Sequence, residues 1–340
     1  MGSIFLDLTG LELSPEEREI LRHPQVGGII FFSRNYESSR QLHDLILQVH
    51  TASTKQLLLT VDQEGGRVQR FLTEFTPLPS LGKIGKLYEK SPNAAITFAK
   101  THGWLMASEL LAVGIDLSFA PILDLDKGLN EVIGKRSFHF DPNIVTELAF
   151  AITQGIKSAG MQTVGKHFPG HGSVITDTHT HFTVDNRNYE TIEKNDLVPF
   201  AKLNTVLDAV MASHIVYSRV DSQPCGFSSV WLQTILREKL NFSGAIFTDD
   251  LSMNAVANLG DISERVELAL QAGCDGLLIC NNRKDAISAL EYLESVASKK
   301  VYSDQRLQKL FPRRTLDVST LRQTTVWRNA VNLLNKLNDN

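Results

Sequence analysis

The run Leu57-Leu58-Leu59-Thr60-Val61, which ends at the polar segment Asp62-Gln63-Glu64-Gly65-Gly66, decides the fold. A short, continuously apolar run that ends in this way is typical of a strand buried on both faces of a parallel sheet. Seven more runs of the same kind occur along the chain. They span residues 4–8, 28–32, 115–120, 162–165, 208–212, 245–248 and 276–280. The sequence therefore predicts eight buried strands.

Segments with apolar residues at helical spacing lie between these runs. Ser14 and Asp141 each precede a proline, the order expected of an N-cap and a first helical residue. Gly160 and Gly273 stand where helices should end. The predicted helices are 39–50, 93–113, 141–158, 189–203, 229–240, 262–272 and 285–296. Eight strands that alternate with helices predict an α/β fold of the (β/α)8 TIM-barrel type. The alternative, if one weak run is not a strand, is a doubly wound sheet with six or seven strands.

The spacing of the runs also bears on domain organisation. About 58 residues separate the starts of the third and fourth runs, nearly twice a usual βαβ unit of about 30, so residues 62–90 should hold a long loop. Residues 316–337 have a helical pattern and should pack outside the barrel. We expect a single TIM-barrel catalytic domain over 1–340, with the barrel at about 1–298 and a helical extension at about 299–340.

Composition excludes several classes of protein. The 340 residues carry 34 basic and 38 acidic side chains, a formal net charge of −4, whereas nucleic-acid binders are usually basic. No apolar stretch reaches the roughly 18 residues needed to span a bilayer, and the first ten residues do not resemble a signal peptide. Three cysteines, an odd number, favour a reducing compartment. We expect a cytoplasmic enzyme with a small-molecule substrate and no nucleic-acid or membrane partner.

Polar residues follow most of the predicted strands, at the end where TIM barrels carry their active sites. These residues are Asp62 and Arg70 after the third strand, Arg136 after the fourth, Lys166 and His167 after the fifth, His214 after the sixth, and Asp249 after the seventh. Unrelated loops have no common reason to place charge at one end of so many strands. The pattern therefore predicts a binding site for a polar ligand at this end.

Single residues within this set also have plainer interpretations. Asp249 directly follows the strand at 245–248, which favours a role in the barrel mouth over a role as a helix N-cap. Asp250 is better interpreted as a cap or a brace for a neighbour. Asp177 lies two residues before His179 and is placed to orient its imidazole, whereas His181 lacks such support.

Four segments resemble glycoside hydrolase family 3. They are VDQEGGRVQR (61–70), GKRSFH (134–139), KHFPGHG (166–172) with D-x-H at 177–179, and FTDDLSM (247–253). The resemblance extends from residue 6 to residue 284 and is strongest to the single-domain bacterial β-N-acetylglucosaminidases of cytoplasmic peptidoglycan recycling. The D-x-H pair distinguishes these enzymes from members that carry a glutamate acid/base on a second domain.

The resemblance implies a role for each matching position. Asp249 matches the catalytic nucleophile, His179 the general acid/base and Asp177 its partner. Residues that match the binding site for N-acetylglucosamine are Asp62, Arg70, Arg136, Lys166 and His167, and His214 joins them by its place after a strand. The implied enzyme is a retaining exo-β-N-acetylglucosaminidase of peptidoglycan fragments such as N-acetylglucosamine linked to 1,6-anhydro-N-acetylmuramyl peptides. We expect it to act as a monomer without cofactor or metal.

Two other functions fit part of the pattern. A metal-dependent hydrolase on the same barrel would use His179-x-His181 and an aspartate as ligands. A sugar-binding protein without catalysis would need only the charged residues at the strand ends. Chelator sensitivity and release of p-nitrophenol from its β-N-acetylglucosaminide distinguish these from a glycosidase.

Overall fold

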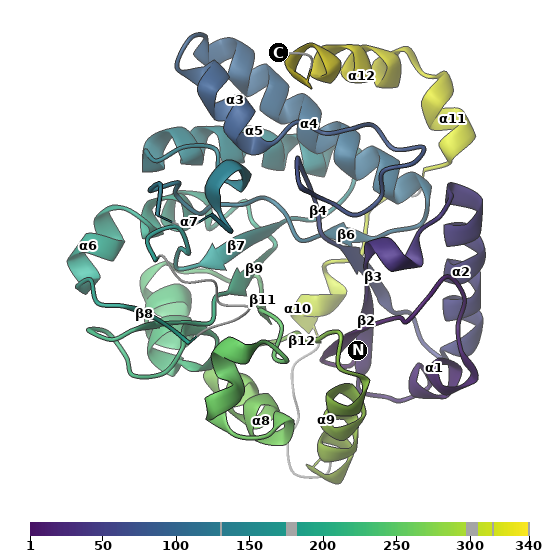
Figure 1. Cartoon of the computed structure of the whole chain (residues 1–340), viewed down its shortest axis with the longest axis vertical. Coiled ribbons are helices and arrows are strands. Elements are labelled where there is room, and N and C mark those ends of the chain that lie inside the picture. Colours follow the sequence, from purple (N-terminus) through teal and green to yellow (C-terminus); the bar gives the residue numbers. More distant parts are fainter. Residues whose placement is uncertain (130, 175–181, 297–304, 315, 339–340) are drawn as a thin grey trace.

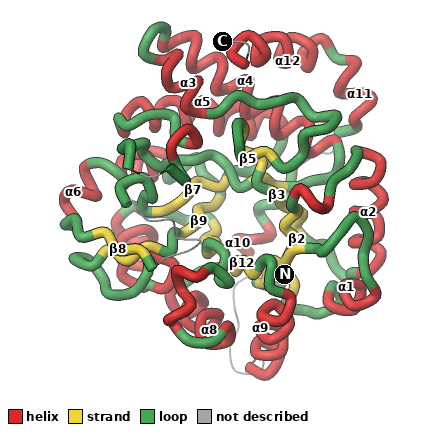
Figure 2. The backbone as a smooth tube through the Cα atoms, in the orientation of Figure 1, coloured by secondary structure: helices red, strands yellow, loops and turns green. Residues whose placement is uncertain are grey.

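Eight parallel strands lie at the centre of the molecule, with helices around them (Figures 1 and 2). The computed structural model describes residues 1–129, 131–174, 182–296, 305–314 and 316–338. The central strands are β1 (Ile4–Asp7), β2 (Val26–Phe31), β3 (Leu58–Val61), β6 (Leu117–Ser118), β7 (Val164–Phe168), β9 (Ala209–Ala212), β11 (Ala245–Thr248) and β12 (Leu277–Ile279). Each of the eight predicted runs overlaps one of these strands. Two strands extend beyond their runs: β2 begins two residues before its run, and β7 extends three residues past its run and so includes Lys166 and His167.

The pairing of the strands closes them into a ring. One sheet has the order β12-β1-β2-β3-β6 and another the order β11-β9-β7. A parallel bridge between Ile122 and Lys166 joins the β6 connection to β7, and one between Phe247 and Gly276 joins β11 to the start of β12. Neighbours in the ring follow the order of the chain. The predicted (β/α)8 barrel is therefore confirmed, and a doubly wound sheet is wrong.

The helices occupy the outside of this ring. Their bounds are α1 (Pro15–Ile20), α2 (Ser39–Ala52), α3 (Leu81–Tyr88), α4 (Pro92–Ala112), α5 (Pro142–Ala159), α6 (Tyr189–Lys194), α7 (Leu197–Leu203), the π-helix η4 (Val230–Lys239), α8 (Ile262–Ala272), α9 (Arg283–Val296), α10 (Gln305–Gln308), α11 (Val318–Gln323) and α12 (Thr325–Asn338). Ser14 and Glu17 form a capping box at α1, and Gly160 and Gly273 end α5 and α8 in the left-handed conformation. These local signals act as the sequence predicts.

Two predicted helices are each divided in the structure. The helix expected over 189–203 becomes α6 and α7, because the ring of Pro199 in a continuous helix would clash with the carbonyl of residue 195. The tail expected over 316–337 divides at Thr324 into α11 and α12. Thr324 Oγ1 accepts the N–H of Trp327 (3.1 Å) and so caps the start of α12.

The connection at 62–90, expected as a long loop, holds short regular elements. Strands β4 (Gln63–Gly65) and β5 (Val68–Gln69) pair antiparallel, and α3 follows them. Outside the ring, β8 (Thr183–Asp185) pairs with β10 (Ile215–Tyr217). Strands of two or three residues give no periodic signal, so sequence reasoning missed them.

The C-terminal helices pack on the outer layer, where α11 and α12 lie against α4 (Figure 1). Trp327 Nε1 donates to Glu109 Oε1 (2.9 Å), and Glu109 Oε2 accepts the N–H of Thr76 (3.0 Å). A buried carboxylate thus ties the tail both to α4 and to the segment before α3.

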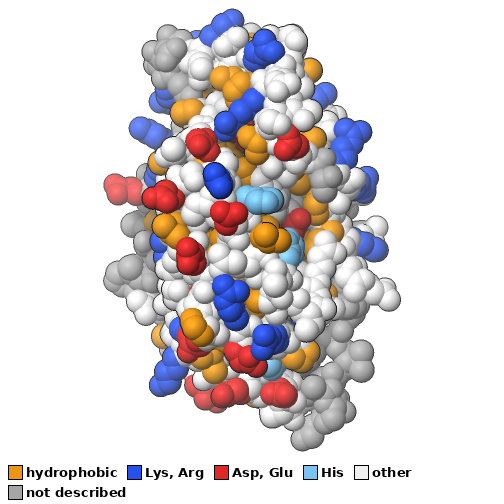
Figure 3. Space-filling model, turned by 90° about the vertical axis from the view of Figure 1, so that its right-hand side faces the viewer, with side chains coloured by type: hydrophobic (Ala, Val, Ile, Leu, Met, Phe, Trp, Pro, Cys, Tyr) orange, Lys and Arg blue, Asp and Glu red, His pale blue; other side chains and the backbone are white. Residues whose placement is uncertain are grey.

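One face of the molecule carries side chains of both charges. On the face in Figure 3, acidic and basic side chains are intermixed with small apolar groups. None of the helices in the described part of the chain is both long and apolar enough to cross a membrane.

Candidate active site

Glu64 lies at the centre of a buried ionic network at the carboxyl end of the barrel. It comes from β4 and is held in a bidentate pair by Arg136, with Nη2–Oε1 at 2.7 Å and Nε–Oε2 at 2.8 Å. Lys166 of β7 places Nζ 2.7 Å from Glu64 Oε1. Three elements distant in sequence therefore meet at one carboxylate.

Asp62 extends this network towards solvent. Its Oδ1 lies 2.7 Å from Lys166 Nζ, and its Oδ2 lies 3.7 Å from Arg70 Nη2. The Lys166 side chain is 2% exposed, whereas those of Asp62 and Arg70 are 20% and 31% exposed. Arg70 Nε is buried and has no hydrogen-bond partner among the described residues. The network thus has a sealed inner part and an open outer part.

Neighbouring groups of opposite charge keep the buried side chains of Glu64 and Lys166 ionised. Burial disfavours the charged form of Glu64, but the Arg136 and Lys166 cations outweigh it and hold the pKa of this carboxyl well below its usual range. Burial likewise opposes the charge on Lys166, yet the Asp62 and Glu64 carboxylates raise its pKa. The region therefore presents fixed charges, which suits it to orient hydroxyl and amide groups of a polar ligand.

His167 follows Lys166 on β7 and is bound by Asp124. Its Nδ1 lies 2.7 Å from Asp124 Oδ2, and its backbone N–H donates to Asp124 Oδ1 (3.1 Å). The same Oδ1 accepts the backbone N–H of His171 (2.7 Å). Close by, Gly172 passes so near the Leu125 carbonyl that a Cβ there would lie 1.7 Å from its oxygen.

Asp249 lies directly beyond β11 at this same end of the barrel. Its backbone N–H donates to Ala212 O (3.0 Å), and its Oδ1 accepts the N–H of Asp250 (2.9 Å). The carboxylate of Asp250 instead braces its neighbours, since its Oδ1 accepts from Ser252 and from the N–H of Cys280 (3.0 Å). Burial raises the pKa of Asp250 to about 6. The two adjacent aspartates therefore have different surroundings, as the sequence predicts.

His214, predicted to contact substrate, is fully buried behind these aspartates. Its Nε2 lies 3.0 Å from the backbone carbonyl oxygen of Asp250, and its ring stacks on Phe227 with centroids 5.5 Å apart. The side chain thus supports the segment that carries Asp249.

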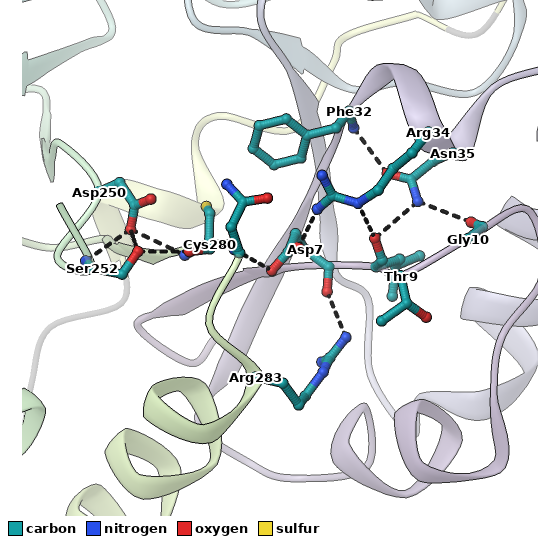
Figure 4. Close-up of polar contacts among 12 residues, drawn as sticks. Asp7, Thr9, Gly10, Phe32, Arg34, Asn35, Asp250, Ser252, Cys280 and Arg283 are labelled. Carbon is teal, nitrogen blue, oxygen red and sulfur yellow. Dashed lines mark hydrogen bonds and ion pairs between the residues drawn. The ribbon is translucent and has the colours of Figure 1, made fainter. Parts of the chain in front are cut away.

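Asp7 at the end of β1 is a further carboxylate of this end (Figure 4). It forms an ion pair with Arg34 and accepts the N–H of Asn281 (3.1 Å), while Asp250 accepts that of Cys280. Carboxylates from the ends of β1 and β11, the two strands that flank β12, therefore accept the successive backbone N–H groups of Cys280 and Asn281. Figure 4 shows Asp250 and Asp7 on opposite sides of this segment.

Asp177, His179 and His181 lie outside the described residues. The ligand set of a metal-dependent hydrolase, His179-x-His181, falls in the same segment. Within the described ranges, no group of three or more His, Cys, Asp or Glu side chains is placed to hold a metal ion.

Sequence reasoning assigned no role to Glu64, Asp124 or Asp7. Glu64 stands in a segment that was recognised, but its partners lie 72 and 102 positions away in the chain. Asp7 lies inside an apolar run, whereas the predicted site residues are those that follow a run. The signal that would find all three is a carboxylate between the last residue of a barrel strand and the sixth residue after it, since Asp7 ends β1, Glu64 lies three residues past β3 and Asp124 six residues past β6.

Residues 5–314 match the family model described as the glycosyl hydrolase family 3 N-terminal domain. A beta-hexosaminidase from Tolumonas auensis is 49% identical over 334 residues, which cover 98% of this chain and 97% of that protein. Native NagZ from Neisseria gonorrhoeae superimposes with a TM-score of 0.91 at 39% identity, covering 99% of this chain and 97% of that one. The same protein in complex with N-trifluoroacetyl-D-glucosamine gives a TM-score of 0.89 at 38% identity, covering 99% and 98%.

These matches extend over nearly the whole barrel and confirm the resemblance carried by the four motifs. The chain belongs to glycosyl hydrolase family 3, and its similarity within that family is to the beta-hexosaminidases.

Proposed function

We propose that this protein is a retaining exo-β-N-acetylglucosaminidase that releases terminal N-acetylglucosamine from peptidoglycan fragments. The observation that carries the proposal is the position of Asp249, which directly follows β11 at the same end of the barrel as the ionic network of Asp62, Glu64 and Lys166. The relatives named beta-hexosaminidase support the activity. The solved relative bound to N-trifluoroacetyl-D-glucosamine supports the sugar class.

In the first step, an Asp249 oxygen attacks the anomeric carbon and the bond from this carbon to the leaving oxygen breaks. The His179 imidazolium gives that oxygen its proton, and Asp177 favours the imidazolium by Coulomb attraction. In the second step, His179 takes a proton from water, the water oxygen attacks the same carbon, and the bond to Asp249 breaks. Two inversions leave the product in the β configuration.

The sugar is held by Asp62, Arg70, Arg136, Lys166 and His167. Arg70 supports this assignment, because its buried Nε lacks a partner among the described residues and an unpaired buried N–H costs about 1–3 kcal/mol. A hydroxyl or carbonyl oxygen of the ligand would satisfy it. Because the His214 side chain is buried, its role is indirect. It supports the segment that carries Asp249, and Asp249 acts on the substrate.

We place this activity in the cytoplasm and in a monomer that folds as one domain. The three cysteines are buried and free, which suits a reducing compartment. Light scattering after size exclusion should give the mass of one chain, and a mass of two chains would contradict the monomer.

The stereochemical outcome tests the mechanism. Proton NMR during hydrolysis of p-nitrophenyl β-N-acetylglucosaminide should show β-N-acetylglucosamine first, with the α anomer appearing only by mutarotation. Appearance of the α anomer first would overturn the double displacement. Incubation with a muropeptide mixture, with mass spectrometry of the products, tests the substrate class; fragments that keep their N-acetylglucosamine would overturn it.

The acid/base role of His179 is tested by the leaving group. His179→Ala should lower kcat/KM about 10²- to 10⁴-fold for muropeptides, whose leaving oxygen needs a proton. The loss should be smaller for dinitrophenyl glycosides, whose leaving group is already a good one. Equal losses for both substrates would contradict the assignment.

A further inference from the structure

Asp124 connects two histidine-containing segments beneath the sugar site. Its side chain is completely buried. Oδ1 accepts two backbone N–H groups, those of His167 and His171, so both of its lone pairs are used. Oδ2 lies 2.7 Å from His167 Nδ1.

We propose that Asp124 is a positioning residue that fixes the tautomer of His167, so that Nε2 of this ring accepts a hydrogen bond from a sugar hydroxyl. The inference rests on the proposed function in one respect, namely that His167 contacts the sugar. It adds the direction of that hydrogen bond and the residue that sets it.

The direction follows from the charge on Asp124. Burial opposes the ionised form of this carboxyl, but His167 and the surrounding donors outweigh burial and lower its pKa. An ionised carboxylate only accepts, so the proton of the neutral imidazole must be on Nδ1, and Nε2 carries a lone pair.

The other nitrogen of the His167 ring is Nε2, on the side of the ring away from Asp124. Nε2 has no hydrogen bond within the described residues, and 9% of the side chain remains exposed at the barrel mouth. Lys166, the preceding residue, supplies donors only. In the Nδ1–H tautomer, the ring therefore offers an acceptor that the neighbouring cation cannot, which suits it to a hydroxyl that donates.

His171 does not compete for the negative charge. Its ring centroid lies 5.6 Å from that of His167, and burial lowers the pKa of His171 to about 4. His171 is thus neutral at pH 7, and the side chain of Asp124 serves the His167 ring alone.

Asp124→Asn reverses this arrangement without changing the shape of the side chain. The two backbone N–H groups must still meet an acceptor, so the amide oxygen takes the place of Oδ1 and the NH2 group faces His167 Nδ1. That nitrogen must then accept, which moves the ring proton to Nε2. The N–H group at Nε2 would then face the O–H group of the sugar, and two donors cannot form a hydrogen bond. The affinity for N-acetylglucosamine should therefore fall roughly 10- to 100-fold.

The experiment combines NMR and calorimetry on the full chain. Ring ¹⁵N spectra of histidine-labelled protein, assigned with His167→Gln, should show the Nδ1–H tautomer in the wild type and the Nε2–H tautomer in Asp124→Asn. Calorimetry with N-acetylglucosamine measures the loss of affinity. Asp116→Asn, which exchanges a carboxylate at the opposite end of the barrel, is the matched control and should change neither readout.

A double-mutant cycle separates positioning from general damage. If Asp124 acts through His167, Asp124→Asn should weaken binding no further in a His167→Gln background than His167→Gln does alone. Additive losses would overturn the proposal, as would an Nε2–H tautomer in the wild-type enzyme, which can be read even if the variant does not fold. Absence of N-acetylglucosamine binding by the wild type would instead count against the proposed function.

Discussion

The two ends of the barrel both carry aspartates, but three at the amino end share one contact, a backbone N–H of a neighbouring segment. Asp116 precedes β6, Asp208 precedes β9 and Asp275 precedes β12, so they stand at alternate strands. Each accepts a backbone N–H from the preceding strand of the ring or, for Asp208, from the residue just before that strand. The donors are Leu59 (2.9 Å), Thr163 (3.0 Å) and Ile246 (2.9 Å).

At the carboxyl end the carboxylates of Asp62, Glu64 and Asp124 bind side chains from other strands, chiefly Lys166 and His167. Their partners are charged or titratable and face the mouth. The comparison teaches that an aspartate just before a buried run fastens two strands together, whereas Asp62, Glu64 and Asp124, beyond the ends of such runs, form the candidate site. Substitutions should therefore change stability at one end and binding or turnover at the other.

The largest expected effect is that of Asp249→Ala. Loss of the nucleophile should lower kcat for p-nitrophenyl β-N-acetylglucosaminide by about 10³-fold or more, because no covalent intermediate can form. Asp275→Ala, at the opposite end, should lower the melting temperature while folded protein keeps its kcat. A folded Asp249→Ala protein with near-normal activity would end the assignment of the nucleophile.

Glu64→Gln should affect both stability and binding, since the network is part of the fold as well as the site. Removing one partner of a buried ion pair costs about 3–5 kcal/mol, and the freed Arg136 and Lys166 would bind sugar less selectively. Urea unfolding and KM measure the two effects. An unchanged midpoint with an unchanged KM would show that the ion pairs are dispensable.

The same variant gives a pH signature. The folded-state pKa of Glu64 lies below its unfolded value of about 4.5, so its contribution to stability is complete above that pH and is lost as the pH falls. The free energy of unfolding of the wild type should therefore drop below pH 4.5 more steeply than that of Glu64→Gln. Parallel curves would contradict the shift.

The contribution of Asp116 to stability should have the opposite pH dependence, and Asp116→Asn tests it. Burial raises the pKa of Asp116 to about 7 from 3.8, so stability is complete below the lower value and declines as the pH rises towards 7. The asparagine keeps an acceptor for Leu59 and has no charge to bury. Its unfolding free energy, followed from pH 4 to 8 by urea titration, should change less than that of the wild type, with kcat unaltered.

Asp208→Asn should have the smallest effect. The amide oxygen can still accept from Thr163, and the lost partner is Lys157, whose side chain is 35% exposed. A partly exposed pair of this kind contributes up to about 1 kcal/mol. A melting temperature within a few degrees of the wild type, with normal KM, is expected; a large rise in KM would break the distinction between the two ends.

The fold could be predicted because each barrel strand is buried on both faces and so appears as an apolar run. The hairpin of β4 and β5 could not, since its residues are polar and its strands too short for a period. The division of the C-terminal helix at Thr324 could not be predicted either, because Thr324 fits the helical pattern of its neighbours. A new helix begins after Thr324 because its hydroxyl oxygen accepts a hydrogen bond from the N–H of Trp327.

The positions of the site residues could be predicted because they follow strands, but their pairing could not. Nothing local in the sequence joins Glu64 to Arg136 or Asp124 to His167. Those contacts arise when the ring closes between β6 and β7 and brings successive strand ends together. The burial of His214 could not be predicted for a related reason, since its ring packs between Phe227, thirteen residues later in the chain, and the carbonyl oxygen of Asp250 beyond β11.

The close passage of Gly172 by the Leu125 carbonyl sets a limit on sequence diversity. Any side chain there would place its first carbon 1.7 Å from a backbone oxygen, and both backbones belong to segments fixed by Asp124. Gly10, by contrast, has nothing within 4 Å of an added Cβ. A saturation library selected for folded enzyme should return glycine alone at 172 and a broad range of residues at 10.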